Sequence, residues 1–216
     1  MLDIVIATGN RHKFRELKAL LAVRGIRYHS LAEFPSITPV REDGKTFAAN
    51  AIKKAKAVAR ATGLPALTDD SGIEVEALGW GPGVTSARFA GRHGDDPANN
   101  RKLLRVLAQL PMGRRRARYR CVLALAGASR LMATANGAWY GRIARASAGR
   151  GGFGYDPLFL VPGLGKTAGQ LPASVKQRLS HRARAARRMR GVLQRLVRAS
   201  GRRGSAAARA AREPAA

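Results

Sequence analysis

The chain has 216 residues, of which 45% are hydrophobic, so it is long enough to bury a sizeable core within one domain or two closely packed lobes. Its 40 Lys plus Arg against 13 Asp plus Glu give a formal net charge of +27, which favours anionic partners. No apolar stretch approaches the length of a membrane span, no signal peptide opens the chain, and the single Cys121 cannot form an internal disulfide, so we expect a protein of the reducing cytoplasm.

Strands and helices alternate in the predicted secondary structure. The second helix is delimited by Thr46 as its N-cap and Gly63 as its C-terminal stop, and the region 118–143 is predicted to be antiparallel. We expect a mixed α/β protein with helices at about 11–23, 46–62 and 97–109 and strands near 2–7, 65–68, 73–76, 118–126, 131–138 and 158–161.

A short polar loop joins the first strand to the first helix and reads Thr8-Gly9-Asn10-Arg11-His12-Lys13. A strand, a glycine-containing loop and a helix in this order point free backbone N–H groups at an anion. Lys13 in the first helical turn is unfavourable unless an anion is bound there. The Walker A spacing is absent, so an ordinary strand-to-helix turn is the alternative.

A later apolar run ends at two adjacent carboxylates, Asp69 and Asp70, which are followed by Ser71 and Gly72. Neighbouring carboxylates repel each other unless a cation lies near them. Carboxylate oxygens on a loop suit Mg²⁺, which keeps several waters and shares its shell with substrate phosphates. In a chain with so few acids, this pair at a strand end predicts a metal site, and a solvated turn is the alternative.

Two segments of the C-terminal half have side chains that suit contacts with a base. Glycines flank Phe153 on both sides, which lets the backbone approach a ligand and leaves a ring face free for stacking. A buried ring in a tight turn is the alternative. Lys176, His181 and Arg182 lie within seven positions and could donate hydrogen bonds to a base oxygen or a phosphate, although a lone His is usually structural.

Further motifs follow in a fixed order along the chain. Together with those above they are Thr8-Gly9-Asn10-x-x-Lys13, Glu42-Asp43-Gly44-x-Thr46-Phe47-x-x-Asn50-Ala51, Lys54-Ala55, Asp69-Asp70-Ser71-Gly72, Pro82-Gly83-Val84-x-Ser86-Ala87-Arg88-Phe89-Ala90-Gly91, Asn99-Asn100-x-Lys102-Leu103-Leu104, Gly152-Phe153-Gly154-Tyr155-Asp156-Pro157, Gly165-Lys166-Thr167 and Ser180-His181-Arg182. This ordered set, from residue 2 to about 198, resembles the inosine triphosphate pyrophosphatase family, whose members hydrolyse non-standard purine nucleoside triphosphates.

The resemblance implies an elongated mixed α/β fold of two lobes with the active site in the cleft between them. It also implies hydrolysis of ITP, dITP and XTP to the monophosphate and pyrophosphate, with Mg²⁺ as the cofactor and a homodimer as the assembly. Such a reaction needs cations for the tetra-anionic triphosphate, and a metal ion and fixed donors for the leaving pyrophosphate.

The resemblance also assigns roles to particular residues. Glu42 and Asp70 would ligate Mg²⁺, with Asp69 close by or behind them, and Asp70 would orient or deprotonate the attacking water. The expected substrate contacts are Thr8, Gly9, Asn10, Arg11, His12, Lys13, Lys54, Ser71, Phe153, Gly154, Tyr155, Asp156, Lys176, His181 and Arg182.

Base recognition would combine stacking on Phe153 with donors from Lys176, His181 and Arg182 toward the six-position oxygen of hypoxanthine or xanthine. Adenine carries an amino group at this position, so donors would face a donor, and each unpaired buried donor costs about 1–3 kcal/mol. Guanine shares the six-position oxygen and must be excluded through its two-amino group, by a means that the sequence does not reveal.

Three acids that are usual in the family are absent from this chain. Ala49, Gln170 and Val175 stand where the family usually has Glu. The expected metal-binding and base-contacting residues are all present, so these departures bear on affinity for metal and substrate rather than on whether the chain is an enzyme.

Residues 200–216 contain Gly, Ser, Arg, Ala and Pro without large apolar side chains. We therefore expect a pyrophosphatase domain at 1–199 and a disordered Arg- and Ala-rich tail after it. Clustered Arg could contact nucleic acid weakly and without sequence preference, or could reflect the Arg and Ala richness of the whole chain. Two alternative functions follow: a basic nucleic-acid-binding protein on a nucleotide-binding scaffold, and a pyrophosphatase with a different base preference.

Overall fold

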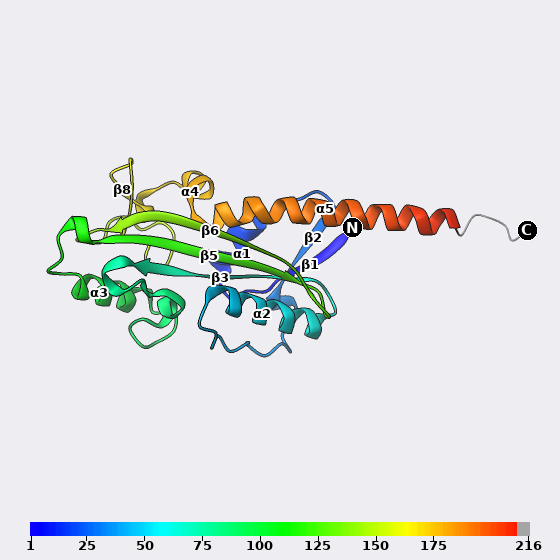
Figure 1. Ribbon diagram of the computed structural model, residues 1–216, viewed down its shortest axis with the longest axis horizontal. Helices are drawn as coiled ribbons and strands as arrows, with labels where there is room; N and C mark the ends of the chain where they lie inside the picture. The colour runs from blue at the N-terminus through cyan, green and yellow to red at the C-terminus, as the bar shows by residue number, and fades with distance from the viewer. Residues whose placement is uncertain (211–216) are drawn as a thin grey trace, which may run out of the picture.

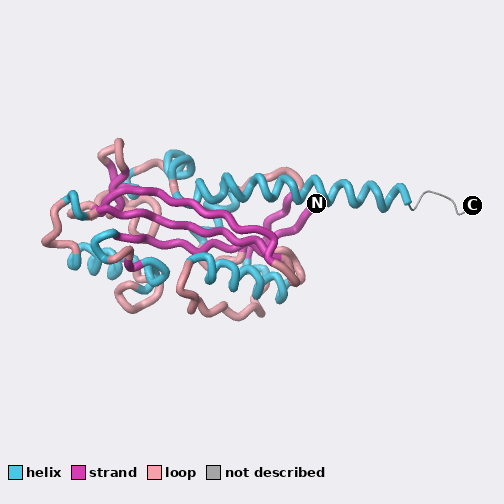
Figure 2. The backbone as a smooth tube through the Cα atoms, in the orientation of Figure 1, coloured by secondary structure: helices cyan, strands magenta, loops and turns pink. Residues whose placement is uncertain are grey.

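Residues 1–210 are described by the computed structural model of the protein, the side chains of 202–210 excepted. Within this range an eight-stranded mixed sheet is ordered β2-β1-β3-β5-β6-β7-β8, and β4 pairs with β3 (Figure 2). The strands are β1 (Leu2–Ile6), β2 (Ile26–Ser30), β3 (Ala66–Val75), β4 (Gly81–Pro82), β5 (Arg116–Ala126), β6 (Leu131–Ile143), β7 (Phe159–Val161) and β8 (Lys166–Thr167). The α-helices are α1 (Arg11–Leu20), α2 (Phe47–Thr62), α3 (Asp96–Val106), α4 (Ala173–Leu179) and α5 (His181–Ala210).

The long strands β3, β5 and β6 run along the elongated molecule, and helices cover both faces of the sheet (Figure 1). Successive side chains of a strand point to opposite faces. In β5 this alternation packs Leu123 and Leu125 against α1 and α5, whereas Val122 and Ala124 pack against α2. The predicted mixed α/β class is therefore confirmed.

The opposite end of the long strands has a core cluster of its own. Ile73, Tyr119, Trp139 and Phe159 pack together there, and Leu103 of α3 joins them. Separate core clusters at the two ends of the sheet are compatible with the two lobes that the sequence predicted.

The predicted break between strands 65–68 and 73–76 is wrong. β3 is one strand of ten residues that includes Asp69 and Asp70, which pair with Leu123 and Val122 of β5. The pairing with β5 satisfies the backbone of this segment and overrides the turn preference of Asp, Ser and Gly.

One edge of β3 is only partly covered by neighbouring strands. β1 pairs with β3 at Ala66 and Leu67, and β4 pairs with it at Glu74 and Val75. Within the described residues no strand pairs with this edge between those two points. The opening lies beyond the carboxyl end of β1, which is where ligands commonly bind in α/β sheets.

The C-terminal helix is longer than expected from composition. α5 continues as a helix to Ala210, whereas the sequence predicted disorder from residue 200. Ala and Arg are strong helix formers, so a segment without large apolar residues can still extend a helix that has already begun. The rest of the predicted tail, 211–216, lies outside the described residues. No helix in the described part of the chain is long and apolar enough to cross a membrane.

Candidate active site

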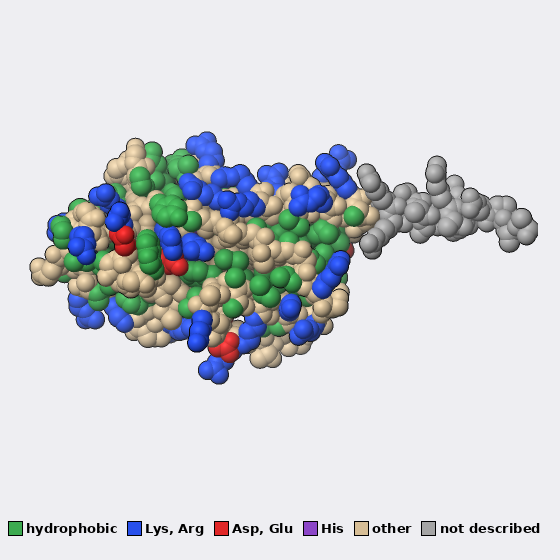
Figure 3. Space-filling view, in the orientation of Figure 1, with side chains coloured by type: hydrophobic (Ala, Val, Ile, Leu, Met, Phe, Trp, Pro, Cys, Tyr) green, Lys and Arg blue, Asp and Glu red, His purple; other side chains and the backbone are tan. Residues whose placement is uncertain are grey.

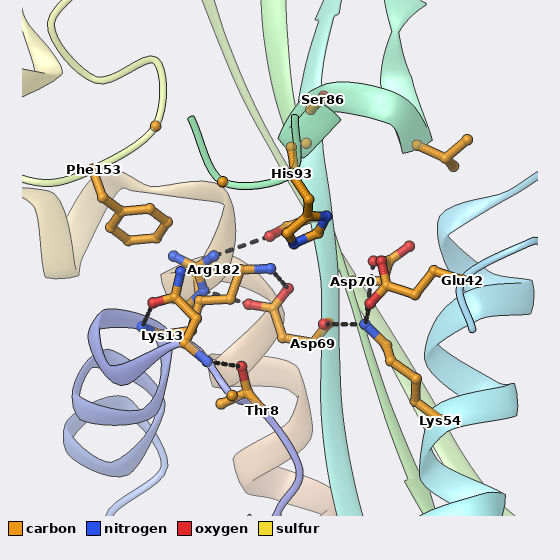
Figure 4. A pocket seen from close by; sticks show the side chains of 18 of the residues that line it. Thr8, Lys13, Glu42, Lys54, Asp69, Asp70, Ser86, His93, Phe153 and Arg182 are labelled. Atoms are coloured by element: carbon orange, nitrogen blue, oxygen red, sulfur yellow. Dashed lines mark hydrogen bonds and ion pairs between the residues drawn. The ribbon is translucent and has the colours of Figure 1, made fainter. Parts of the chain in front are cut away.

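A cleft of about 540 Å³ lies at the open edge of β3. Its walls come from the loop before α1, from α2, from the segment after β4, from the Phe153 loop and from the start of α5 (Figure 4). Of the predicted site residues only Arg11 and His12 do not line it. Arg11 borders a neighbouring hollow, and the His12 ring stacks on that of Phe153 with centroids 5.8 Å apart. The cleft is lined by the predicted Thr8, Gly9, Asn10, Lys13, Glu42, Lys54, Asp69, Asp70, Ser71, Phe153, Gly154, Tyr155, Asp156, Lys176, His181 and Arg182.

The loop before α1 is partly closed by its own side chain. Asn10 is the N-cap of α1, and its Oδ1 accepts hydrogen bonds from the backbone N–H groups of His12 at 2.9 Å and Lys13 at 3.0 Å. Most backbone N–H groups of this loop are therefore already bonded within the chain. Those of Gly9 and Arg11 have no acceptor among the described residues, and of these two residues only Gly9 lines the cleft, so its N–H is the backbone donor that an anion there can meet.

Asp69 belongs to a buried ion-pair network. Arg182 donates through Nε to Asp69 Oδ2 at 2.5 Å and also to Glu16 at 2.5 Å and to Ser71 Oγ at 3.0 Å, while Lys13 Nζ lies 3.6 Å from Asp69 Oδ1. Burial alone would raise the pKa of the Asp69 carboxyl, but Arg182 and Lys13 hold it well below its usual range. Asp69 is therefore ionised and fixes the Arg182 guanidinium in place.

Asp70 points away from Asp69, toward Glu42 and Lys54 (Figure 4). Lys54 Nζ donates to Glu42 Oε1 at 2.6 Å and lies 3.3 Å from Asp70 Oδ1 and 3.1 Å from the Asp69 carbonyl oxygen. Burial raises the pKa of the Asp70 carboxyl. The Lys54 ammonium lowers this pKa, but only partly offsets the effect of burial, and the nearby Glu42 carboxylate raises it further. Burial also disfavours the ionised form of Glu42, yet the Lys54 ammonium outweighs burial and lowers the pKa of Glu42. The two carboxylates are thus tuned in opposite directions, as in acid–base pairs.

The end of the cleft that contains Asp70 and Glu42 offers carboxylate oxygens, which suit Mg²⁺ as ligands. Asp70 Oδ2 is buried and has no hydrogen-bond donor within the described residues, and the Glu42 carboxylate faces the same lysine nitrogen. No cluster of three or more His, Cys, Asp or Glu that could enclose a metal occurs in residues 1–210. Two carboxylates suffice for Mg²⁺, which takes its other oxygens from water and substrate phosphates. Asp69 lies behind them, paired with Arg182.

The Phe153 ring marks the other end of the cleft. Lys176 Nζ lies 4.9 Å and Arg182 Cζ 5.4 Å from the ring centroid, both within the range of a cation–π contact. Lys176 also donates to Asp156 Oδ2 at 2.6 Å and pairs with Glu16 at 3.2 Å. Asp156 Oδ2 further accepts the backbone N–H of Phe153 at 2.9 Å, so this carboxylate ties the lysine to the aromatic loop.

His181, the third expected donor to the base, differs from Lys176 and Arg182 in charge. Its ring is buried and stacks on Tyr119 with centroids 4.5 Å apart, and its Nδ1 has no partner among the described residues. Burial, together with the neighbouring Arg182, lowers the pKa of His181 well below its usual value. The imidazole is therefore neutral and can donate from only one of its two nitrogens.

Two residues that line the cleft, Asp96 and His93, were missed from the sequence, and so was Glu16, which does not line it but pairs with two residues that do. Glu16 accepts from Arg182 and pairs with Lys176, and its position three residues after Lys13 on α1 was the available signal. Asp96 accepts the backbone N–H of Gly154 at 2.6 Å and so anchors the Phe153 loop. His93 reaches the cleft from an exposed loop, and no local pattern marks it (Figure 4).

The chain is similar to known proteins over most of its length. Similar curated proteins include the dITP/XTP pyrophosphatase of Desulforamulus reducens, 50% identical over 90% of this chain and 97% of that protein, and the dITP/XTP pyrophosphatase of Geobacillus kaustophilus, 49% identical over 86% and 91%. Among solved structures, a HAM1 protein from Coxiella burnetii superposes with a TM-score of 0.82 at 40% identity and covers 90% of this chain and 100% of that one. The family model described as "Ham1 family" matches residues 4–192. The chain belongs to the Ham1 family.

Proposed function

We propose that the protein hydrolyses non-canonical purine nucleoside triphosphates, namely ITP, dITP and XTP, to the nucleoside monophosphate and pyrophosphate. The observation that carries this proposal is the single cleft that has a carboxylate–lysine cluster at one end and an aromatic ring with two cations at the other. The names of the similar curated proteins, dITP/XTP pyrophosphatases, support the same substrate class.

At the phosphate end, Lys13, Lys54 and the free backbone N–H group of Gly9 bind the triphosphate. Glu42 and Asp70 would hold Mg²⁺, which when bound neutralises charge that develops on the phosphoryl oxygens. Asp70 accepts a proton from the attacking water, since its raised pKa and unpartnered Oδ2 suit a general base.

At the base end, Phe153 stacks on the purine while the Arg182 guanidinium and Lys176 ammonium donate to the six-position oxygen. The bonds from Arg182 to Asp69 and Glu16 fix the guanidinium before substrate arrives, which reduces the cost of ordering on binding. Adenine would place its amino group against these donors, and each donor left unpaired costs about 1–3 kcal/mol.

Pyrophosphate release from ITP, XTP, dITP, ATP and GTP, each with and without Mg²⁺, tests the proposal. We expect fast release from the first three and slow release from ATP, with a requirement for the metal. Orthophosphate as the product would show that a different bond is cleaved. Equal rates on ATP would remove the argument from base recognition and favour the alternative of another base preference.

The family resemblance further supports a homodimer in the cytoplasm, with a catalytic domain that ends near residue 199. Light scattering of the purified protein across a concentration series measures the assembly. A mass that remains that of one chain at all concentrations would contradict the dimer.

A further inference from the structure

Five exposed arginines form a stripe along the outer face of α5, which we call the α5 arginine stripe. Successive members of the stripe are three, one, seven and three positions apart along the chain. Because each residue of an α-helix turns by 100°, all five lie on one side of the helix. The opposite side of α5 is buried against the sheet through Ala185, Met189 and Leu193. Lys and Arg side chains gather over this part of the molecule in Figure 3. The stripe consists of Arg184, Arg187, Arg188, Arg195 and Arg198.

The charges of the stripe are not neutralised within the described part of the chain. The only residue of α5 that forms an ion pair there is Arg182, which faces the cleft. Arg184 and Arg187 donate to the backbone carbonyls of Leu179 at 3.2 Å and Arg178 at 2.9 Å. These bonds orient the guanidinium groups without removing their charge, and like charges three or four residues apart repel each other on a helix.

We propose that the α5 arginine stripe binds the phosphate backbone of nucleic acid, as an activity separate from nucleotide hydrolysis. The stripe rises about 21 Å along the helix axis, and a duplex presents one phosphate charge per about 1.7 Å of its axis, so a linear row of guanidinium groups can face a linear row of phosphates. External phosphates supply the counter-charge that the chain itself does not provide.

Two features of α5 favour the phosphate backbone of nucleic acid, the first over a lipid surface and the second over unpaired bases. No large hydrophobic side chain is exposed on the described part of α5, and its apolar face is already packed on the sheet, so the helix has nothing to insert into a lipid surface. The stripe side of α5 also carries no Phe, Tyr or Trp that could stack on bases. The contact is therefore with the backbone and independent of base sequence.

The test uses full-length protein and fluorescence anisotropy with a labelled duplex of about 30 base pairs, at salt concentrations from about 50 to 200 mM. The stripe variant changes the five stripe arginines to Gln. A matched control changes five exposed arginines elsewhere to Gln, and a third variant changes the four tail arginines to Gln. The control positions are Arg60, Arg101, Arg105, Arg114 and Arg130, and the tail positions are Arg202, Arg203, Arg209 and Arg212.

We expect the stripe variant to bind at least about tenfold more weakly at 100 mM salt and to lose about four from the slope of log K against log salt. The control and tail variants should keep most of the affinity for the duplex and most of the salt-dependence slope. ITP hydrolysis and the far-ultraviolet circular dichroism spectrum should be unchanged in all three, and the latter reports folding even if the hydrolysis proposal fails.

Three results would overturn the proposal. Equal losses in the stripe and control variants would mean that only the total charge matters. A larger loss in the tail variant would move the contact to residues 202–212. Stripe-dependent binding to phosphatidylserine vesicles as tight as that to the duplex would show a general affinity for polyanions instead of a nucleic-acid surface.

Discussion

Replacement of one carboxylate, Asp70→Asn, tests the phosphate end of the cleft most directly. The change preserves the size of the side chain but removes the negative charge 3.3 Å from Lys54 Nζ and the buried Oδ2 that lacks a donor. Since general base catalysis and charge at the metal site are both lost, we expect turnover to fall about 10²–10⁴-fold.

The same substitution should not weaken the fold. Burial raises the pKa of Asp70, so the folded protein disfavours its charged form, and a neutral amide avoids that penalty. Lys54 retains its hydrogen bond to Glu42 at 2.6 Å. We therefore expect a melting temperature that is unchanged or higher together with the loss of turnover, a combination that misfolding would not produce.

The assay is steady-state pyrophosphate release from ITP at saturating Mg²⁺, followed as a function of pH, together with a thermal melt. In the unmodified protein kcat/KM should rise with pH as Asp70 deprotonates, and Asp70→Asn should abolish this rise. Asp43→Asn is the control, since this exposed carboxylate pairs with Lys53 at 2.6 Å outside the cleft. If Asp70→Asn kept most of its turnover, or if the control lost as much, Asp70 would not be the base.

Four further substitutions or deletions test the rest of the site and the domain boundary. Phe153→Ala should weaken binding of ITP and XTP equally, by about 1–3 kcal/mol, because stacking does not depend on base identity; a loss confined to one substrate in a competition assay would contradict stacking. Arg182→Ala should narrow the ratio of ITP to ATP turnover and, because it leaves Asp69 buried without its partner, lower the unfolding free energy by about 3–5 kcal/mol; an unchanged ratio excludes Arg182 as a base reader. Glu42→Gln should mainly raise the Mg²⁺ concentration for half-maximal rate, and a titration that superposes on that of the parent protein would remove Glu42 from the metal site. Deletion of residues 201–216 should leave kcat/KM and the melting temperature almost unchanged at about 150 mM salt, because the segment has no large apolar side chain to bury; a lower melting temperature would show that the segment contributes to the fold.

The sequence predicted which residues line the cleft better than it predicted how they pair and which of them are charged. Motif order brought Asp70, Lys54, Phe153 and Arg182 into one expected site, and the structure places them in one cleft. The pairing of Arg182 with Asp69 spans 113 positions, so no local pattern contains it. The neutral state of His181 likewise follows from burial, which only the packed core determines.

Two of the three missing acids have a structural explanation. Ala49 is the third residue of α2, where a Glu would accept the backbone N–H of the N-cap Thr46 and complete a capping box. Gln170 keeps the equivalent role in its own turn, because its Oε1 accepts the backbone N–H of Thr167 at 2.9 Å. Both positions therefore concern helix starts rather than metal binding. Nothing in the structure explains Val175.

The open edge of β3 also decides which parts of the site can vary without harm. Asp69, Asp70 and Ser71 lie on a strand whose other edge pairs in continuous antiparallel register with β5, so the alignment of the carboxylates is fixed by the sheet. Loops surround the opening and control entry to it. Insertions or substitutions in those loops should therefore change which ligands enter and how fast they leave, while the distance from Asp70 to Lys54 stays the same.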